Sequence, residues 1–248
     1  MIECINDRMI EWGAIALTLL LFSCQSEDRP LVIATAASNQ PAMEILLEDF
    51  TAASGIEAEL VVAASGQLTA QLLAGAPYDV FISADERYPN KLMDVNMIAG
   101  KPQVFARGSL VLWSGRDDVK LNPAELTSGN RLAIANPKVA PFGRLADSLL
   151  RLRPDYSERI QPRLVYGESI GQVNQFVFTG AVEMGLTARS IVHENSRGRW
   201  EPFYPEVTIP QTVSIIRGNR EEDGRIFIEY LLGTEAQETL RRAGYSLD

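Results

Sequence analysis

Small and hydroxyl-bearing residues stand directly before four predicted helices of this chain. The four segments are Ala36-Ala37-Ser38-Asn39, Ala63-Ala64-Ser65-Gly66, Ala140-Pro141-Phe142-Gly143 and Gly167-Glu168-Ser169-Ile170-Gly171, called here the first to fourth junctions. The first turn of a helix has N–H groups without an intrahelical partner and about half a positive charge. Four such ends meeting at one point would offer roughly +2, which suits a small dianion.

The donors at the junctions indicate which anion could bind. No junction contains lysine or histidine, and only Arg144 follows one, so the contacts would come from the hydroxyls of Ser38 and Ser65 and from backbone N–H groups. We expect Arg144, at the start of a helix, to point to solvent. A site made only of donors leaves the proton of a protonated oxyanion unpaired, which costs about 1–3 kcal/mol. Fully deprotonated tetrahedral oxyanions are therefore favoured over hydrogen phosphate. Helix capping is the better explanation of any single junction, and only the set of four indicates a site.

Alternating apolar runs and amphipathic segments predict the elements that position the junctions. Strands are expected at 31–35, 59–63, 78–83, 131–135, 163–165 and 183–186, and helices at 41–53, 68–74, 144–152, 172–178 and 224–243. Two extended runs, 104–114 and 207–217, join two similar β-α series. This pattern predicts an α/β fold of two lobes, each a mixed, mostly parallel sheet with helices on both faces.

The expected lobe boundaries follow from the two extended runs. One lobe would comprise residues 31–108 and 213–248, and the other residues 109–212. Open sheets of this type bind ligands beyond the carboxyl ends of their strands, which is where all four junctions lie. The sequence therefore predicts a ligand cleft between the lobes.

The N-terminal segment has the pattern of a lipoprotein leader. Residues 12–22 form an apolar run too short to span a bilayer, and Leu21-Phe22-Ser23-Cys24 resembles a bacterial lipobox. We expect a signal peptide at 1–23, a lipid on Cys24 and a linker at 24–30. The lipid would tether the protein on the periplasmic or cell-surface side of a membrane, whereas the alternative reading of Cys24 is a buried cysteine. The only other cysteine is Cys4, so disulfides and thiol catalysis are not expected beyond the leader.

Composition narrows the function classes. The chain has 248 residues, of which 46% are hydrophobic, and this is enough for a large core. Its net charge is −9 and it has no run of Lys or Arg, so the charge pattern of a nucleic-acid-binding protein is missing.

Five further residues fit structural roles better than chemical ones. Asp79 and Asp85 flank a strand without a third ligand at matching spacing, so capping or hinge hydrogen bonds are expected there in place of a metal. His193 is the only histidine, so Ser-His-Asp chemistry would have to use it, and a surface position is expected for it. Trp113 and Trp200 are expected to pack in the core or between the lobes.

Several separated blocks resemble the molybdate-binding proteins of bacterial ABC transporters (the ModA family), over residues 31–246. The blocks are 36–39, 66–85, 135–144, 166–172 and 210–213. The resemblance implies a periplasmic binding protein of type II architecture. It places oxyanion contacts at Ser38, Asn39 and Ser65 and at the backbone N–H groups of Phe142 and Ile170.

A second set of candidate contacts lies beside these five residues: Gly66, Gly143, Ser169, Thr187 and Ala188. Some members of the family have a tyrosine where this chain has Ala188. One contact of the family is therefore unassigned here, and whether Thr187 replaces it is open.

The resemblance also implies a function. The protein would be the solute-binding component of an ABC importer, capturing molybdate by hinge closure and delivering it to the permease subunits. No catalysis, cofactor or direct metal ligand is expected, since the metal arrives within the oxyanion, and the protein would act as a monomer. Binding of tungstate or sulfate by the same fold is one alternative. A lipid-anchored hydrolase using the cleft is another, and it predicts a nucleophile and a base within reach of each other.

Overall fold

The computed structural model of the chain describes residues 29–123, 126, 131–192 and 197–247. Cys24, the predicted signal peptide and His193 lie outside the described residues. Leu31–Asp248 form one compact unit, distinct from Met1–Pro30. Among the described helices, none combines the length and the apolar character that a membrane crossing requires.

The elements alternate along the chain as the sequence pattern predicts. The strands are β1 (Leu31–Ala36), β2 (Ala58–Ala63), β3 (Val80–Ser83), β4 (Ile98–Ser114), β5 (Leu132–Ala135), β6 (Leu164–Gly167), β7 (Met184–Ala188), β8 (Arg199–Pro202) and β9 (Thr208–Ile216). The α-helices are α2 (Gln40–Ser54), α3 (Ser65–Leu73), α4 (Arg87–Asp94), α5 (Pro141–Arg151), α6 (Ile170–Phe178), α7 (Glu221–Leu232) and α8 (Thr234–Arg242). Three short helical segments are η2 (Tyr156–Ile160), η3 (Gln161–Arg163) and η4 (Arg189–Ile191).

Two long strands join the two halves of the sheet. The strand order is β2-β1-β3-β9-β4-β7-β5-β6, with β8 paired to β4. β1 pairs in parallel with β2 and β3, and β5 pairs in parallel with β6 and β7, whereas β4 and β9 pair antiparallel with each other and with their neighbours. We call the elements around β1, β2 and β3 lobe 1 and those around β5, β6 and β7 lobe 2. The predicted extended runs are thus confirmed as the crossing strands β4 and β9, and the β-α part of each lobe is parallel.

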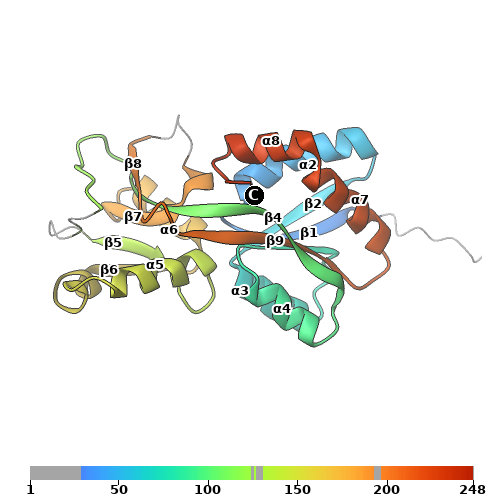
Figure 1. Ribbon diagram of the computed structural model, residues 1–248, viewed down its shortest axis with the longest axis horizontal. Coiled ribbons are helices and arrows are strands. Elements are labelled where there is room, and N and C mark those ends of the chain that lie inside the picture. The colour runs from blue at the N-terminus through green and yellow to red at the C-terminus, as the bar shows by residue number, and fades with distance from the viewer. Residues whose placement is uncertain (1–28, 124–125, 127–130, 193–196, 248) are drawn as a thin grey trace, which may run out of the picture. The chain divides into compact units, whose positions relative to one another are not determined.

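Helices cover both faces of the sheet in lobe 1 (Figure 1). Leu31 and Ile33 of β1 face α2, α7 and α8, and they pack in one core with Phe50 and Phe227. Ala34 of β1 faces the other way, into a second core with residues of α3 and α4. The period-2 alternation of buried side chains along β1 explains why both faces need a covering layer.

The core of lobe 2 extends into lobe 1. Leu110 and Leu112 of β4, Leu186 of β7 and Phe142 of α5 belong to one buried cluster, which also contains alanines of lobe 1. The other face of β4 and β7 packs against α6 through Trp113 and Val177. Because one apolar cluster spans both lobes, the lobes are in contact in this structure. The predicted boundaries at residues 108 and 212 fall inside β4 and β9, so they stay a prediction.

The C-terminal helix predicted at 224–243 is wrong as a single helix. Gly233 adopts an extended conformation (φ −71°, ψ 160°) that separates α7 from α8. Glycine interrupts helices readily because it gains more backbone freedom than other residues outside them. The break directs the chain end toward β4, where the backbones of Ser246 and Arg107 exchange two hydrogen bonds.

The helix α4 and the strand β8 are not anticipated by the sequence pattern. The α4 segment is mostly polar, and its start depends on Asp85, whose carboxylate accepts from the Tyr88 N–H at 3.3 Å. The strand β8 is short and exposed, and it forms only through pairing with β4. Both are therefore decided by contacts that local periodicity does not record.

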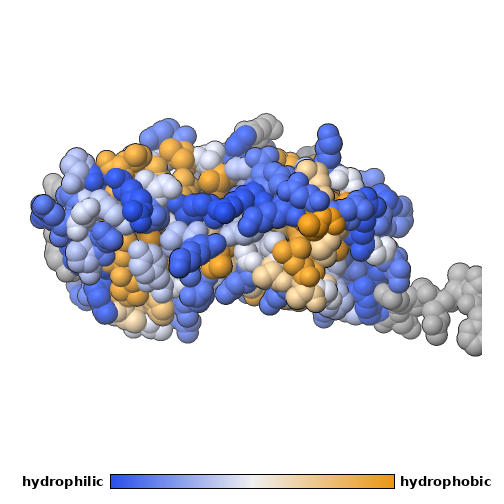
Figure 2. Space-filling model, turned by 90° about the horizontal axis from the view of Figure 1, so that it is seen from below, coloured by the Kyte–Doolittle hydropathy of each residue, from blue (hydrophilic) through white to orange (hydrophobic). Residues whose placement is uncertain are grey.

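The surface seen from below alternates hydrophilic areas with smaller hydrophobic patches (Figure 2). The exposed large apolar side chains of lobe 1 include Leu73 of α3 and Met93 of α4. The outward faces of these two helices are therefore partly apolar.

Candidate functional site

The four junctions form a closed ring of contacts. The Ala37 N–H donates to the Ala63 carbonyl at 2.9 Å, joining the first and second junctions. The Gly66 N–H donates to the Val139 carbonyl at 2.9 Å, joining the second junction to the segment before the third.

Two further contacts complete the ring. The Asn136 N–H donates to the Gly167 carbonyl at 2.6 Å, linking the segment before the third junction to the fourth. A methyl group placed on Gly171 would lie 3.8 Å from the Ala37 side chain, so the fourth junction lies against the first. The N-termini of α2, α3, α5 and α6 therefore gather at one place, two from each lobe.

The first junction supplies two buried donors without a partner. Ser38 is 2% exposed and Asn39 is fully buried. The Ser38 hydroxyl and the Asn39 amide nitrogen have no hydrogen-bond partner among the described residues. A buried donor left unpaired costs about 1–3 kcal/mol, so these atoms are suited to a ligand that accepts hydrogen bonds.

Ser65 of the second junction has a hydroxyl group that can donate a hydrogen bond to a ligand. It is fully buried, and its Oγ accepts from the Ala84 N–H at 3.1 Å. Because that bond uses a lone pair of the oxygen, the hydroxyl proton of Ser65 is left for another acceptor. The Ser65 oxygen is therefore held by the backbone that follows β3, and its O–H can rotate toward an acceptor.

The third and fourth junctions supply backbone donors. In α5 the first N–H to bond back within the helix is that of Arg144, to the Ala140 carbonyl at 3.0 Å. In α6 the Val173 N–H is the first to do so, to the Ser169 carbonyl. The N–H groups of Phe142 and Ile170 precede these bonds, so they have no intrahelical partner. Phe142 is 1% exposed and Ile170 is 4% exposed.

Small apolar residues of both lobes surround this point. Ala36, Ala64 and Ala84 of lobe 1 and Ala140 and Ala188 of lobe 2 belong to one buried cluster. Short side chains let the helix ends approach each other, and the burial lowers the local dielectric. Hydrogen bonds to a charged acceptor are stronger in such surroundings.

Two residues of the second candidate set are engaged elsewhere in this structure. The Gly66 N–H bonds the Val139 carbonyl across the lobes, so it is not a free donor. Thr187 is fully buried, and its hydroxyl donates to the Asn174 side chain of α6. Alternation along β7 puts Thr187 on the opposite face from Ala188, because successive strand residues point to opposite faces. In this structure the Thr187 hydroxyl therefore faces α6, and its role as an anion contact stays a prediction.

The other three residues of this set lie at the ring. Ser169 caps α6, its oxygen accepting from the Gln172 N–H at 3.3 Å. Gly143 approaches the end of β5 so closely that an added methyl group would lie 2.1 Å from the Ala135 carbonyl oxygen. Ala188 is fully buried and offers no side-chain donor.

Arg144 does not point to solvent as expected. Its guanidinium forms an ion pair with the Asp85 carboxylate, joining α5 of lobe 2 to the end of β3 in lobe 1. The guanidinium carbon also lies 5.5 Å from the centre of the Tyr88 ring. The Tyr88 hydroxyl donates to the Lys138 carbonyl at 3.1 Å. These contacts hold the lobes together beside the ring.

Sequence reasoning missed two residues behind the first junction. Ser190 of η4 donates its hydroxyl to the Ser38 carbonyl at 2.8 Å, and Tyr245 donates to the Asn39 side-chain oxygen at 2.6 Å. Both are buried. No motif or spacing could have found them, since they lie 152 and 206 positions from their partners.

The aspartates have the structural roles that were predicted. The Asp79 carboxylate accepts from the Val32 N–H at 2.8 Å, and Asp85 accepts from the Tyr88 N–H and pairs with Arg144. Among the described residues, no group of three or more His, Cys, Asp or Glu could hold a metal ion.

The tryptophans pack as predicted. Trp113 is buried against Val177, and Trp200 packs at the edge of the same cluster with the Arg189 guanidinium 4.3 Å from its ring centre.

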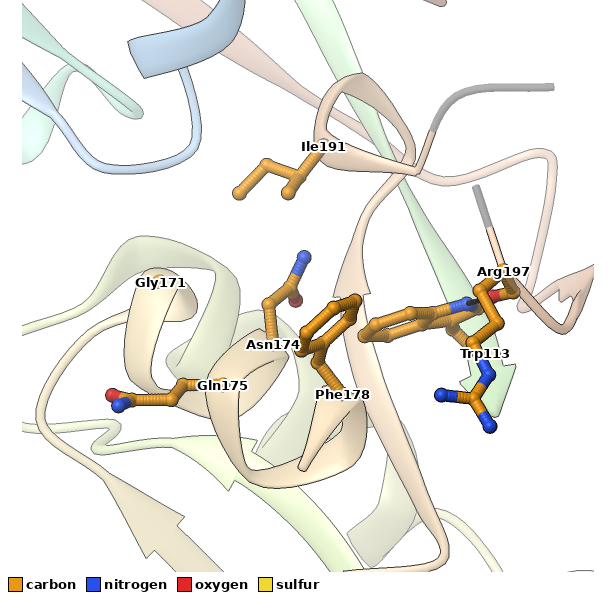
Figure 3. Close-up of a pocket in the computed structure, with 7 residues that line it drawn as sticks. All are labelled: Trp113, Gly171, Asn174, Gln175, Phe178, Ile191 and Arg197. Carbon is orange, nitrogen blue, oxygen red and sulfur yellow. Dashed lines mark hydrogen bonds between the residues drawn. The ribbon is translucent and has the colours of Figure 1, made fainter. Parts of the chain in front are cut away.

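A cavity of about 570 Å³ lies beside α6 in lobe 2. Its lining is mainly apolar, and Figure 3 shows the rings of Trp113 and Phe178 side by side with Ile191 on another wall. The Trp113 N–H is already donated to the Arg197 carbonyl at 3.3 Å, and the Asn174 oxygen accepts from Thr187. The polar groups of this lining are Asn174, Gln175 and Arg197. The ring instead gathers the buried donors of Ser38 and Asn39, which have no partner among the described residues, so the ring is the candidate site for a small anion.

The chain is similar to known solute-binding proteins. The family described as bacterial extracellular solute-binding protein matches residues 31–246. The molybdate-binding protein ModA of Rhodobacter capsulatus is 31% identical over 243 residues, which cover 94% of this chain and 95% of the relative. The ModA of Azotobacter vinelandii is 29% identical over 248 residues, which cover 94% of this chain and 96% of the relative.

A solved structure extends this similarity to the fold. The periplasmic molybdate-binding protein of Azotobacter vinelandii aligns with a TM-score of 0.80 at 29% identity. The alignment covers 88% of this chain and 99% of that protein. The family match over residues 31–246 spans both lobes and all four junctions.

Proposed function

The chain belongs to the bacterial extracellular solute-binding proteins, and on this basis we propose that it binds molybdate between its two lobes. The observation that carries the proposal is the ring of four helix N-termini with buried, unpartnered donors at Ser38 and Asn39. Molybdate is the ligand in the names of the relatives with 31% and 29% identity. The contacts would be the side chains of Ser38, Asn39 and Ser65 and the backbone N–H groups of Phe142 and Ile170.

Neutral donors suffice to hold a dianion at this place. Each hydrogen bond to a charged acceptor contributes about 1.5–3 kcal/mol, and the converging helix ends add a positive potential. The one arginine beside the ring, Arg144, is paired with Asp85. The site therefore rejects a protonated oxyanion, whose proton would face donors only.

Binding would be coupled to closure of the lobes. Lobe 1 supplies the first two junctions and lobe 2 the last two, so the contacts of the anion are complete only when the lobes meet. A ligand that binds one state better shifts the population toward it. We propose that the permease subunits of an ABC importer recognise this closed state and receive the anion from it.

Calorimetric titration of the purified full chain tests the ligand. Molybdate and tungstate, which share charge and shape, should each bind with one anion per chain, and phosphate at neutral pH should bind about fivefold to a hundredfold more weakly. The titration with sulfate distinguishes the candidate ligands, since sulfate differs from molybdate mainly in size. Tight sulfate binding without a molybdate signal would overturn molybdate as the ligand, and no binding of any of the four would overturn the function.

We also propose that the protein is tethered through a lipid on Cys24, which the lipobox-like segment at 21–24 supports. A protein with Cys24→Ser should move from the membrane fraction to the soluble fraction of cells. Unchanged membrane association of that variant would contradict the anchor. The site needs one chain only, so a monomer is expected, and light scattering of the purified protein would measure this.

A further inference from the structure

Asn39 stands at the N-cap of α2 but does not cap it. Asparagine at this position usually accepts a hydrogen bond from the N–H of the second or third helical residue. Here the side chain makes no capping bond, and its oxygen accepts from the Tyr245 hydroxyl at 2.6 Å. The oxygen of the amide is therefore turned away from the helix end, toward the C-terminal segment of the chain.

The hydrogen bond from Tyr245 determines which polar atom of the Asn39 amide has no partner. The two polar atoms of a carboxamide point in directions about 120° apart, so the nitrogen is directed away from Tyr245. That nitrogen is buried and has no partner among the described residues, like the neighbouring Ser38 hydroxyl. The first junction thus presents two side-chain donors, the Asn39 amide nitrogen and the Ser38 hydroxyl.

The direction of the Tyr245 bond is also determined. Two acceptors lie at the Tyr245 hydroxyl, the Asn39 side-chain oxygen and the Ser38 carbonyl at 3.2 Å, and the Ser190 hydroxyl is a further neighbour. The phenol must therefore be protonated and donate. Burial raises the pKa of Tyr245 above its ordinary value, which keeps the donor proton in place.

The surroundings of Tyr245 hold it rigidly. Its own N–H bonds the Leu240 carbonyl at 3.2 Å, and the next residue, Ser246, pairs with Arg107 of β4. From lobe 2, the Ser190 hydroxyl donates to the same Ser38 carbonyl at 2.8 Å. The peptide between Ser38 and Asn39 is therefore held from both lobes when they meet.

We propose that Tyr245 is a positioning residue that orients the Asn39 amide with its NH2 group toward the anion, and thereby sets the preference for fully deprotonated oxyanions. This inference rests on the proposed function and deepens it. Without the phenol, the amide is free to turn its oxygen to the ligand. That oxygen would repel a fully deprotonated oxyanion and accept the proton of hydrogen phosphate.

The test is the ratio of two affinities, measured by calorimetry on the full chain with molybdate and with phosphate at neutral pH. Tyr245→Phe should weaken molybdate binding about tenfold and phosphate binding much less, so the molybdate-to-phosphate ratio falls about tenfold. A purely structural role would lower both affinities together and leave the ratio unchanged. Tyr230→Phe is the matched control, because it removes a hydroxyl from α7, away from the four helix N-termini. It should keep the wild-type ratio of molybdate to phosphate affinity.

A second variant, at Asn39 itself, tests the orientation of the Asn39 amide even if Tyr245→Phe does not fold. Asn39→Asp keeps the acceptor for Tyr245 but replaces the NH2 group with a second oxygen, so molybdate binding should fall by about a hundredfold or more and the ratio should fall with it. A wild-type ratio in either variant would overturn the inference and leave the proposed function intact. Wild-type protein that binds neither molybdate nor any other tetrahedral oxyanion would overturn both.

Discussion

At the scale of residues, the site is defined by hydroxyl groups whose partners differ. Ser65 has a backbone partner in the Ala84 N–H, whereas the Ser38 hydroxyl has none among the described residues. Both are buried to 2% exposure or less. Removing the two oxygens should therefore affect ligand binding alike and stability differently.

Ser38→Ala and Ser65→Ala should each weaken molybdate binding about tenfold or more, because each removes a hydrogen bond to a charged acceptor. Ser65→Ala should also lower the free energy of unfolding of the ligand-free protein by about 1–3 kcal/mol, since the buried Ala84 N–H loses its acceptor. Ser38→Ala should not lower it. Calorimetric titration and urea unfolding measure the two effects.

Ser214→Ala is the matched control for this pair. Ser214 of β9 is also buried with an unpartnered hydroxyl, but it lies in the lobe 1 sheet opposite Phe81 of β3. Replacing Ser214 with alanine should leave the affinity for molybdate unchanged. Wild-type affinity in both Ser38→Ala and Ser65→Ala would show that the anion binds elsewhere.

At the scale of elements, the site depends on how closely helix ends approach each other. A methyl group added to Gly66, at the start of α3, would lie 2.6 Å from the Tyr88 hydroxyl and 2.8 Å from the Val139 carbonyl oxygen. Val139 belongs to lobe 2, so the added group would stand between the lobes. Lobe 1 itself has room for it once the lobes separate and Tyr88 moves.

Gly66→Ala should therefore oppose closure without opposing folding. The affinity for molybdate should fall about tenfold to a hundredfold, while the ligand-free protein should be as stable as wild type, because alanine favours a helix over glycine by about 1 kcal/mol. Small-angle scattering with and without molybdate would follow closure directly. Gly218→Ala is the control, since nothing lies within 4 Å of a methyl group there, and normal closure by Gly66→Ala would contradict the prediction.

At the scale of the whole molecule, lobe closure is held by few polar contacts. Asp85 and Arg144 form an ion pair across the lobes with side chains 15% and 28% exposed. Partly buried pairs are screened less than surface pairs, so this one is expected to stabilise the closed state. The Asp85 carboxylate also caps α4 through the Tyr88 N–H, a role that asparagine can keep.

Asp85→Asn should release molybdate faster, by about threefold to tenfold, with little change in the rate of binding. Stopped-flow displacement with an excess of tungstate would measure the release rate. Asp147→Asn provides the comparison, since Asp147 pairs with Arg151 inside α5 and does not join the lobes. Equal release rates for Asp85→Asn and wild type would mean that this ion pair does not hold the closed state.

Local sequence determined the junctions and most of the elements, with α4, β8 and the break between α7 and α8 as exceptions. Apolar alternation located β1, β2 and β3, and Gly55 ends α2 in the left-handed conformation (φ 72°) that is typical of a helix C-cap. The start of α5 at Pro141 lies three residues before the predicted start, because the third junction is itself the first turn of the helix. Patterns of 2 and 3.6 residues are local, and neighbouring residues alone decide them.

Tertiary structure alone decided which groups at the junctions are free. The sequence placed hydroxyls at Ser38 and Ser65 and left Thr187 open, but only packing shows that Thr187 faces Asn174 and that Ser38 has no partner. It also decided the partners of Asn39 and Arg144, which come from Tyr245 at the chain end and from Asp85 in the other lobe. A hydrogen bond depends on distance and direction in space, and segments far apart in sequence meet only after the sheet and its covering helices have formed.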